Sequence, residues 1–235
     1  MQLCGQINSN FNDLCQLNSL WRNHYDIKYN IIFKKKYNYE NYRLYYDLCI
    51  VKKKLKIDSD IDSLYKSEFL LLYNKRSNEI PKEIGQLVNL LYIDIRDNNL
   101  TKLPIEIGKL INLRQLFLCD NQLTNFPKEM SQLTNLQILT GENNKLTQLP
   151  TEIGKLTNLH KLYFNNNQLT EISNEIGELP KLETLYLRNN QLTILPEKIT
   201  QLTTLLHLDL RNNLLTKIPD KLRQLPYLQQ AHYSF

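Results

Sequence analysis

Leucine and isoleucine recur along most of this chain in one pattern that repeats every 23 residues. The unit reads Leu-x-x-Leu-x-Leu-x-x-Asn-x-Leu. A further unit fits upstream from Ser67, and an incomplete one begins at Leu228, which gives seven repeats and a C-terminal stub. A fixed period of this length indicates a solenoid, in which each repeat forms one coil and stacks on its neighbours. The first leucine of the unit falls at Leu90, Leu113, Leu136, Leu159, Leu182 and Leu205.

Each unit predicts one short strand followed by one short helical turn. Paired leucines such as Leu116 and Leu118 alternate with other residues, which is the period of a strand with one buried face. Strands of successive units must run parallel, and the crossover between them contains Pro-x-x-Ile-Gly-x-Leu. Proline suits the start of a helical turn and glycine its exit. The expected fold is therefore an α/β solenoid with strands on the concave side and short α-helical or 3₁₀ turns on the convex side.

An asparagine occupies position nine of six consecutive units, where the chain leaves the strand. A side-chain amide both donates and accepts hydrogen bonds, so a stacked column of amides can satisfy backbone groups that the turn buries. The sequence thus predicts a structural ladder of Asn98, Asn121, Asn144, Asn167, Asn190 and Asn213.

Three units depart from the pattern without changing its spacing. Lys75 replaces the ladder asparagine of the first unit, so the ladder is expected to end there. Gly141 replaces a buried strand leucine, which predicts a void or an inward shift of the neighbouring strands. Ser173 replaces the proline that begins the helical turn.

The phrase Leu-Pro-x-Glu-Ile-Gly, at residues 103–108 and 149–154, resembles the intracellular, Ras-group type of leucine-rich repeat found in Scribble-like and Ras-suppressor proteins. The resemblance covers residues 67–235, and residues 65–235 are expected to form the repeat domain. It implies a non-enzymatic scaffold that binds another protein on the concave face and needs no cofactor. The chain is rich in Asn, Lys, Ile and Tyr. This composition resembles that of leucine-rich-repeat proteins of large DNA viruses of amoebae, or of their protist hosts.

Aromatic and arginine side chains at concave positions predict a partner-binding surface. Residues of these types most often anchor protein interfaces, although aromatic strand residues also pack on one another for stability. Neighbouring strands lie about 4.8 Å apart, so residues one repeat apart are expected side by side. The predicted surface comprises Phe69, Tyr92, Phe117, Tyr163, Tyr186, Arg188 and Arg211.

Residues 1–64 contain no repeat and are expected to form a helical cap over the first coil, because a solenoid needs its end repeats covered. An alternative interpretation gives this segment its own function. Residues 12–25 resemble the second half of an F-box, although the Leu-Pro opening of that box is missing. The resemblance implies a ubiquitin-ligase receptor that binds a Skp1-like adaptor through Leu14, Leu17, Leu20 and Trp21.

Charge and candidate chemistry argue against other functions. The net charge is +5, but residues 67–235 are nearly neutral, with 18 basic and 17 acidic residues, so nucleic acid is not an expected partner. Cys119 and His207 are four strands apart, which excludes a catalytic Cys–His pair. His207, Asp209 and His232 are expected to lie on one exposed face and to bind water rather than a metal. We therefore expect no enzyme activity, cofactor or metal.

Cysteine usage and hydropathy favour a cytoplasmic protein, in the host cytoplasm if the chain is viral. The four cysteines have no pairing pattern, and the chain shows no cysteine-rich cap. There is neither an apolar signal segment nor an apolar stretch long enough to span a membrane.

Overall fold

The computed structural model describes residues 39–232. The chain divides into two compact units, Met1–Tyr46 and Asp47–Phe235, and the second contains all the repeats. The adaptor-binding candidates Leu14, Leu17, Leu20 and Trp21 lie outside the described residues.

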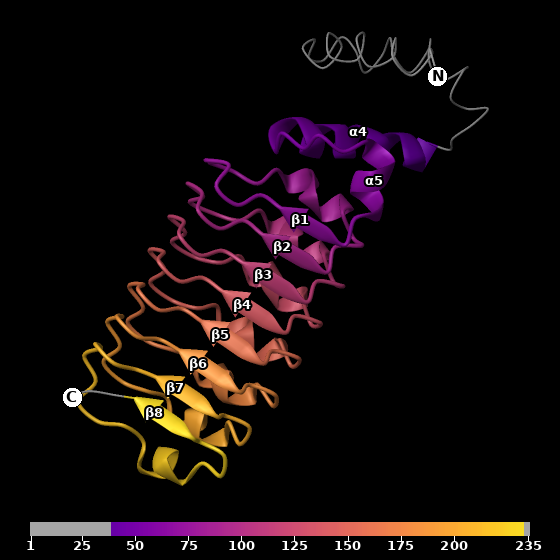
Figure 1. The fold of residues 1–235 in the computed structure, drawn as a ribbon. Coiled ribbons are helices and arrows are strands. Elements are labelled where there is room, and N and C mark those ends of the chain that lie inside the picture. Colours follow the sequence, from indigo (N-terminus) through magenta and orange to yellow (C-terminus); the bar gives the residue numbers. More distant parts are fainter. Residues whose placement is uncertain (1–38, 233–235) are drawn as a thin grey trace. The chain divides into compact units, whose positions relative to one another are not determined.

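Eight three-residue strands form one parallel sheet in chain order (Figure 1). Each strand residue pairs with the residue 23 positions later, as Leu116 does with Leu139. The predicted register and the predicted α/β solenoid are therefore confirmed. The strands are β1 (Phe69–Leu71), β2 (Tyr92–Asp94), β3 (Gln115–Phe117), β4 (Ile138–Thr140), β5 (Lys161–Tyr163), β6 (Thr184–Tyr186), β7 (His207–Asp209) and β8 (Gln230–His232).

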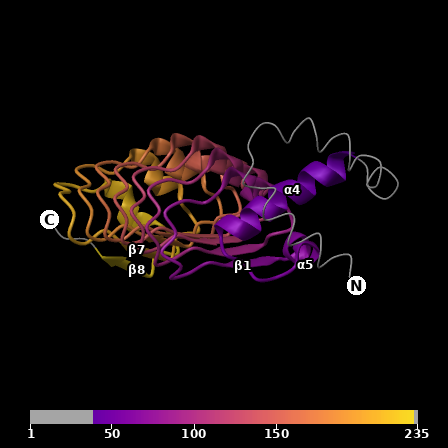
Figure 2. The same ribbon diagram turned by 90° about the horizontal axis from the view of Figure 1, so that it is seen from above.

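Every crossover contains a five-residue 3₁₀ helix, and Figure 2 shows these helices gathered on one side of the coils with the strands on the other. A proline precedes each helix except one, where Ser173 adopts the same backbone, with φ −70° and ψ 157°. The 3₁₀ helices are η1 (Lys82–Gln86), η2 (Ile105–Lys109), η3 (Lys128–Gln132), η4 (Thr151–Lys155), η5 (Asn174–Glu178), η6 (Glu197–Gln201) and η7 (Asp220–Gln224).

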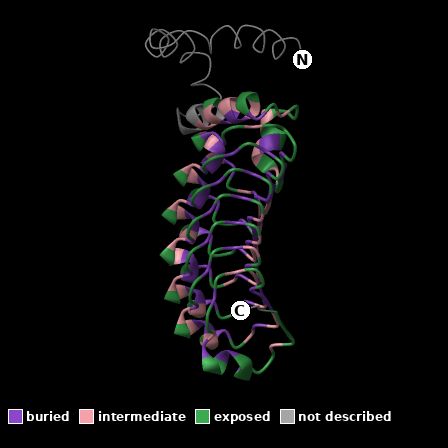
Figure 3. Ribbon diagram, turned by 90° about the vertical axis from the view of Figure 1, so that its left-hand side faces the viewer, coloured by how far each residue is buried: buried purple, intermediate pink, exposed green. Residues whose placement is uncertain are grey.

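The aliphatic core runs without interruption between the sheet and the 3₁₀ helices (Figure 3). The position-one leucines from Leu90 to Leu205 have no exposed surface. Burying one such side chain contributes about 1.5–3 kcal/mol, so each coil is stabilised mainly by its neighbours.

Two helices precede the repeats: α4 (Tyr39–Lys54) and α5 (Ile61–Lys66). From Asp47 onward, α4 contacts the first coil. Val51 is fully buried, and the Asp47 carboxylate accepts a hydrogen bond from Gln86 Nε2 at 3.0 Å. In α5, Leu64 is buried, and the carbonyl of Tyr65 accepts a hydrogen bond from Asn89 at 2.8 Å. These contacts shield part of the first coil from solvent.

The glycine of Ile-Gly is needed for a different reason from the helix exit expected from the sequence. It lies inside the 3₁₀ helix, and none of the described glycines has a positive φ. A Cβ atom on Gly108 would lie 2.4 Å from the carbonyl oxygen of Glu129 in the next coil, and one on Gly177 would lie 2.2 Å from that of Lys198. Close approach of successive coils therefore requires glycine here, and the helix-exit explanation was wrong.

Gly141 leaves no void, so the expectation of a void was also wrong. The ring of Phe164 in the next repeat occupies the space, because a Cβ atom on Gly141 would lie 2.4 Å from its Cε1. Phe164 is fully buried and meets Phe126 edge-on, with ring centroids 5.6 Å apart. The register holds, with Thr140 paired to Tyr163. A large side chain in one coil thus compensates for the small one beside it.

This compensation predicts strong coupling between Gly141 and Phe164. We expect Gly141→Leu alone to destabilise the protein by about 3 kcal/mol through overpacking. In a Phe164→Leu background the same change restores the repeat pattern, so its cost should fall to about 1 kcal/mol or less. Urea denaturation of the wild type, both single variants and the double variant measures the coupling energy. An equal cost of Gly141→Leu in both backgrounds would contradict the explanation.

Candidate functional site

Position-nine asparagines form a continuous ladder beside the sheet. Asn121 is representative: its Nδ2 donates to the carbonyls of Ile95 at 2.9 Å and Leu118 at 3.1 Å, and its Oδ1 accepts from the Leu100 N–H at 3.0 Å. Each amide therefore satisfies groups of its own coil and of the preceding one. Equivalent bonds to both coils run through the ladder residues Asn98, Asn121, Asn144, Asn167, Asn190 and Asn213.

Two more asparagine ladders, which the sequence analysis missed, run parallel to the first. In one, Asn143 Nδ2 donates to Asp120 at 2.8 Å, and Asn166 Nδ2 donates to Asn143 at 2.6 Å. These residues have φ near +56°, a conformation that Asn and Asp tolerate better than most residues. In the other, asparagines between a 3₁₀ helix and the following strand, such as Asn112 and Asn135, donate to carbonyls of the preceding coil at 2.9 Å. Asparagine at a spacing of 23 residues was the available signal.

We call the outward side of the eight strands the strand face, which corresponds to the predicted concave side. The aromatic residues of the predicted partner-binding surface form two separate groups on this face. Phe69, Tyr92 and Phe117 stack with centroid distances of 5.9 and 5.0 Å. Tyr163 and Tyr186 form the second group, with centroids 5.2 Å apart. All except Phe69, which is 59% exposed, are half-buried, so these rings both pack on one another and present surface.

The first aromatic group continues along β1 into two residues that the sequence analysis did not single out. Leu71 and Tyr73 occupy the next outward positions after Phe69, and they are 54% and 56% exposed. Their place in the same two-residue alternation was the available signal. The N-terminal end of the strand face is therefore apolar.

Two arginines of the strand face form matching forks with aspartates of their own strands. Arg96 donates through Nε and Nη2 to both oxygens of Asp94, at 2.9 and 2.6 Å, and Arg211 binds Asp209 at the same distances. Burial alone would raise the pKa of each carboxyl, but the hydrogen bonds from the arginine outweigh it and hold the pKa below its ordinary value. Arg188, by contrast, forms no ion pair with any residue in the described range.

A polar network occupies the middle of the strand face. The Cys119 thiol donates to the Thr140 hydroxyl at 3.1 Å, and Asn165 Nδ2 donates to the Glu142 carboxylate at 2.6 Å. The Asn165 oxygen also accepts from the Arg188 N–H at 2.9 Å. Burial raises the pKa of the Cys119 thiol, which keeps it protonated at neutral pH and a poor nucleophile.

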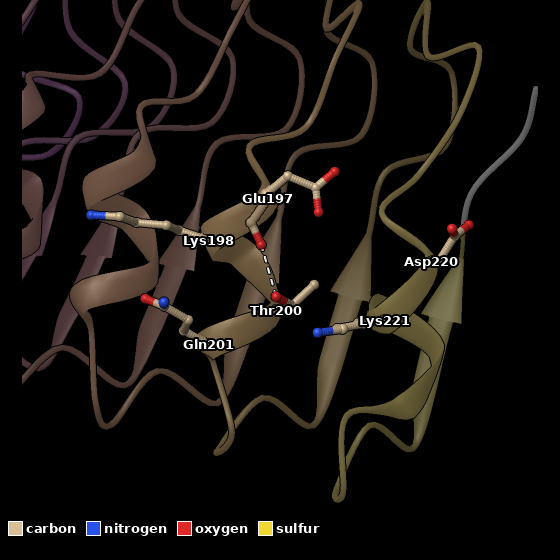
Figure 4. A pocket seen from close by; sticks show the side chains of 6 residues that line it. All are labelled: Glu197, Lys198, Thr200, Gln201, Asp220 and Lys221. Atoms are coloured by element: carbon tan, nitrogen blue, oxygen red, sulfur yellow. Dashed lines mark hydrogen bonds between the residues drawn. The ribbon is translucent and has the colours of Figure 1, made fainter.

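A hollow of about 380 Å³ opens on the other side of the coils, between η6 and η7 (Figure 4). Thr200 stands there in place of the helix glycine, and its hydroxyl donates to the Glu197 carbonyl at 2.8 Å. Contact between successive 3₁₀ helices is much weaker here than between η5 and η6, where Gly177 permits close approach. The hollow is thus a packing consequence of a side chain at the glycine position. Its charged lining is mixed: Glu197, Lys198, Asp220 and Lys221.

Residues 39–232 contain few features of other kinds of site. No cluster of three or more histidine, cysteine or acidic residues is arranged to hold a metal ion in this range. Likewise, none of the described helices is long and apolar enough to cross a bilayer.

The 23-residue coils, the parallel sheet and the asparagine ladder define a leucine-rich-repeat protein. A family model described as a leucine-rich repeat region matches residues 44–165, and two more leucine-rich-repeat models match residues 157–202 and 180–230. The chain belongs to the leucine-rich-repeat family.

Solved structures of the same fold come from several sources. A leucine-rich-repeat protein of Leptospira interrogans is 42% identical with a TM-score of 0.72, over 76% of this chain and 47% of that one. The chain therefore spans about half the length of that relative. The ectodomain of the Arabidopsis thaliana receptor kinase GASSHO1/SCHENGEN3, in complex with Casparian strip integrity factor 2, is 34% identical with a TM-score of 0.62, over 66% and 19%. The repeat domain of the type III effector XopL is 28% identical with a TM-score of 0.61, over 72% and 70%. No curated protein matched the sequence.

Proposed function

We propose that this chain is a non-enzymatic scaffold that binds a partner protein on its strand face. The observation that carries the proposal is the pair of aromatic groups on that face, which expose rings beside the polar network of its middle strands. Exposed aromatic residues beside arginine are typical of interface anchors. The proposed contact residues are Phe69, Tyr92, Phe117, Tyr163, Tyr186, Arg188 and Arg211.

Rigidity of the strand face supports this function. Three asparagine ladders and the arginine forks fix the backbone and four of the charged side chains before any partner arrives. A surface that is already ordered loses little conformational entropy on binding, which favours affinity. The Arabidopsis relative was solved with a bound factor, which gives a precedent for recognition by this fold.

Alanine at both Tyr163 and Tyr186 is expected to weaken partner capture at least tenfold while the fold survives. Hot-spot aromatic residues contribute about 2 kcal/mol or more each to binding, whereas half-exposed strand pairs contribute about 1 kcal/mol or less to folding. Affinity capture from extracts of the source cells, followed by quantitative mass spectrometry, compares the variant with the wild type.

The matched control removes exposed apolar surface elsewhere. Ile105 and Ile111 are 58% and 53% exposed and lie off the strand face, so their double alanine variant should retain the partners. Retention of every partner by the tyrosine variant would remove this surface from consideration.

A second proposal gives residues 1–64 a role in ubiquitin ligation, with Leu14, Leu17, Leu20 and Trp21 binding a Skp1-like adaptor and the strand face holding the substrate. Its support is the F-box-like pattern of residues 12–25. Co-purification with a Skp1-like protein distinguishes the two proposals: a stable complex favours the ligase receptor, and its absence leaves the simple scaffold.

We also propose that the repeats are of the intracellular, Ras-group type and that the protein acts in the cytoplasm, which is the host cytoplasm if the chain is viral. The Leu-Pro-x-Glu-Ile-Gly phrases support the type, and the spacing of the cysteines, which shows no pairing pattern in the sequence, supports the compartment. Residues 1–64 would then serve as the helical cap of a repeat domain at residues 65–235.

A further inference from the structure

A second hollow, of about 190 Å³, opens on the strand face at β6 to β8. The register places His207 beside Gln230 and Asp209 beside His232, so polar side chains of neighbouring strands converge on one space. The side chains that matter for its chemistry are Tyr186, His207, Asp209, Arg211, Gln230 and His232.

His207 has a buried ring nitrogen without a partner. Its Nδ1 makes no hydrogen bond to the residues of the described part of the chain. His160, which lies two repeats and one residue earlier, shows the usual arrangement: its Nδ1 lies 2.7 Å from the Asn158 carbonyl oxygen. Native proteins pair nearly all buried polar atoms, so an unpaired one in a residue that lines a hollow points to that residue as a hydrogen-bonding group of a ligand site.

Charge around the hollow favours an anion. The Asp209 carboxylate is neutralised by Arg211, and that fork uses only two of the five N–H donors of the guanidinium. Arg188 on the neighbouring strand adds an unpaired positive charge close enough to stabilise the ionised form of Asp209. A ligand cation would be repelled by both arginines, whereas an apolar group would leave the His207 nitrogen unpaired.

We propose that this hollow takes the carboxylate of an aspartate or glutamate side chain of the partner protein. The carboxylate accepts hydrogen bonds from the His207 ring and from the free guanidinium donors of Arg211, while Arg188 supplies charge. Tyr186 lines the hollow and also belongs to the second aromatic group, so the acidic residue of the partner lies beside its apolar contacts. The identity of the carboxylate as a partner side chain rests on the proposed function, but the chemistry of the hollow can be tested alone.

The test titrates the full chain with sodium acetate at constant pH and ionic strength and follows the imidazole resonances by NMR. Acetate should shift the His207 ring signals saturably, with a midpoint on the order of 10 mM for so small a ligand. His160, whose ring is already hydrogen-bonded, is the internal reference and should not shift. Acetamide has the same shape without charge, and methylammonium carries the opposite charge; neither should produce the His207 shift. A saturable response to methylammonium, or none to acetate, overturns the proposal.

Two variants make the test specific. Arg188→Gln should weaken acetate binding about tenfold, because it removes a positive charge that attracts the anion. The fold should survive, because the exposed guanidinium has no ion pair within residues 39–232. Arg114→Gln removes the same charge from an exposed position on the face of an earlier coil and should leave the midpoint unchanged. Equal effects of the two variants would mean that the response depends only on the overall charge of the protein, and would overturn the assignment.

Failure of this proposal is distinguishable from failure of the proposed function. If acetate does not bind but the Tyr163/Tyr186 variant loses its partners, only the carboxylate site is wrong. If acetate binds as expected and that variant keeps every partner, strand-face recognition through the tyrosines is wrong and the hollow is an anion site of another purpose.

Discussion

Replacing Asn144 with alanine is expected to destabilise the protein by about 3 kcal/mol, because one buried amide satisfies groups of two coils. Its Nδ2 donates to the carbonyls of Leu118 and Gly141 at 3.0 and 3.2 Å, and its Oδ1 accepts from the Leu123 N–H at 2.9 Å. Alanine leaves these buried backbone groups without partners, and water has little access where the asparagine is only 8% exposed. Urea denaturation followed by circular dichroism measures the loss.

Asn112→Ala is the matched control for the ladder. Asn112 has one hydrogen bond to the preceding coil, to the Val88 carbonyl at 2.9 Å, and it is exposed, so water can replace it. We expect Asn112→Ala to lower the free energy of unfolding by about 0.5–1 kcal/mol. Amide hydrogen exchange adds a local measurement: protection of the Leu123 N–H should fall in Asn144→Ala and stay unchanged in Asn112→Ala. Similar losses of stability in the two variants would mean that burial of the ladder amides has little importance.

Local pattern was sufficient to predict the coil architecture. Register, strand position and the main ladder all follow from residues that recur every 23 positions, since identical coils must stack identically. The same reasoning could have found the other two ladders, because Asn143, Asn166 and Asn112 recur at that period as well. The position-nine consensus by itself accounts only for the first ladder.

Side-chain pairing on the strand face was only partly predictable. The sequence places Tyr163 beside Tyr186, and the rings do meet. It does not show that Asp209 binds Arg211 in a fork, because that depends on rotamers chosen among several charged neighbours. As a result Arg188 and Arg211, which were predicted as equivalent contact residues, differ in whether their charge is already paired.

Contacts between coils were the least predictable feature. Phe164 fills the space at Gly141 from a position 23 residues away, and the carbonyl of Glu129 approaches Gly108 from the next coil. The sequence of one repeat predicts neither contact, because each involves a residue of another repeat. Within one repeat, a glycine near the end of a helical turn indicates only a helix exit. Thr200 shows the consequence of losing the close approach, since the hollow of Figure 4 opens where η6 and η7 separate.

Replacing the glycine of each 3₁₀ helix that contains one with alanine is expected to lower the free energy of unfolding. The loss should grow as the carbonyl oxygen of the next coil lies closer to the added Cβ atom. A Cβ atom would lie 2.9 Å from the neighbouring carbonyl oxygen at Gly85, 2.6 Å at Gly154, 2.4 Å at Gly108 and 2.2 Å at Gly177. Alanine favours helical backbone over glycine by about 1 kcal/mol, which opposes the clash. Gly85→Ala should therefore be nearly neutral, whereas Gly108→Ala and Gly177→Ala should each cost about 3 kcal/mol or more, since a backbone carbonyl can move only with its coil.

Ser131 occupies the equivalent position in η3 and already carries a Cβ atom, so Ser131→Ala is the control and should change stability by less than about 1 kcal/mol. Thermal and urea unfolding of the five variants give the ranking. If glycine served only to end the helical turn, the four glycine variants would cost the same regardless of the carbonyl distance. A graded series instead locates the requirement between coils, where one added methyl group forces neighbouring repeats apart and weakens the core contacts on which each repeat depends.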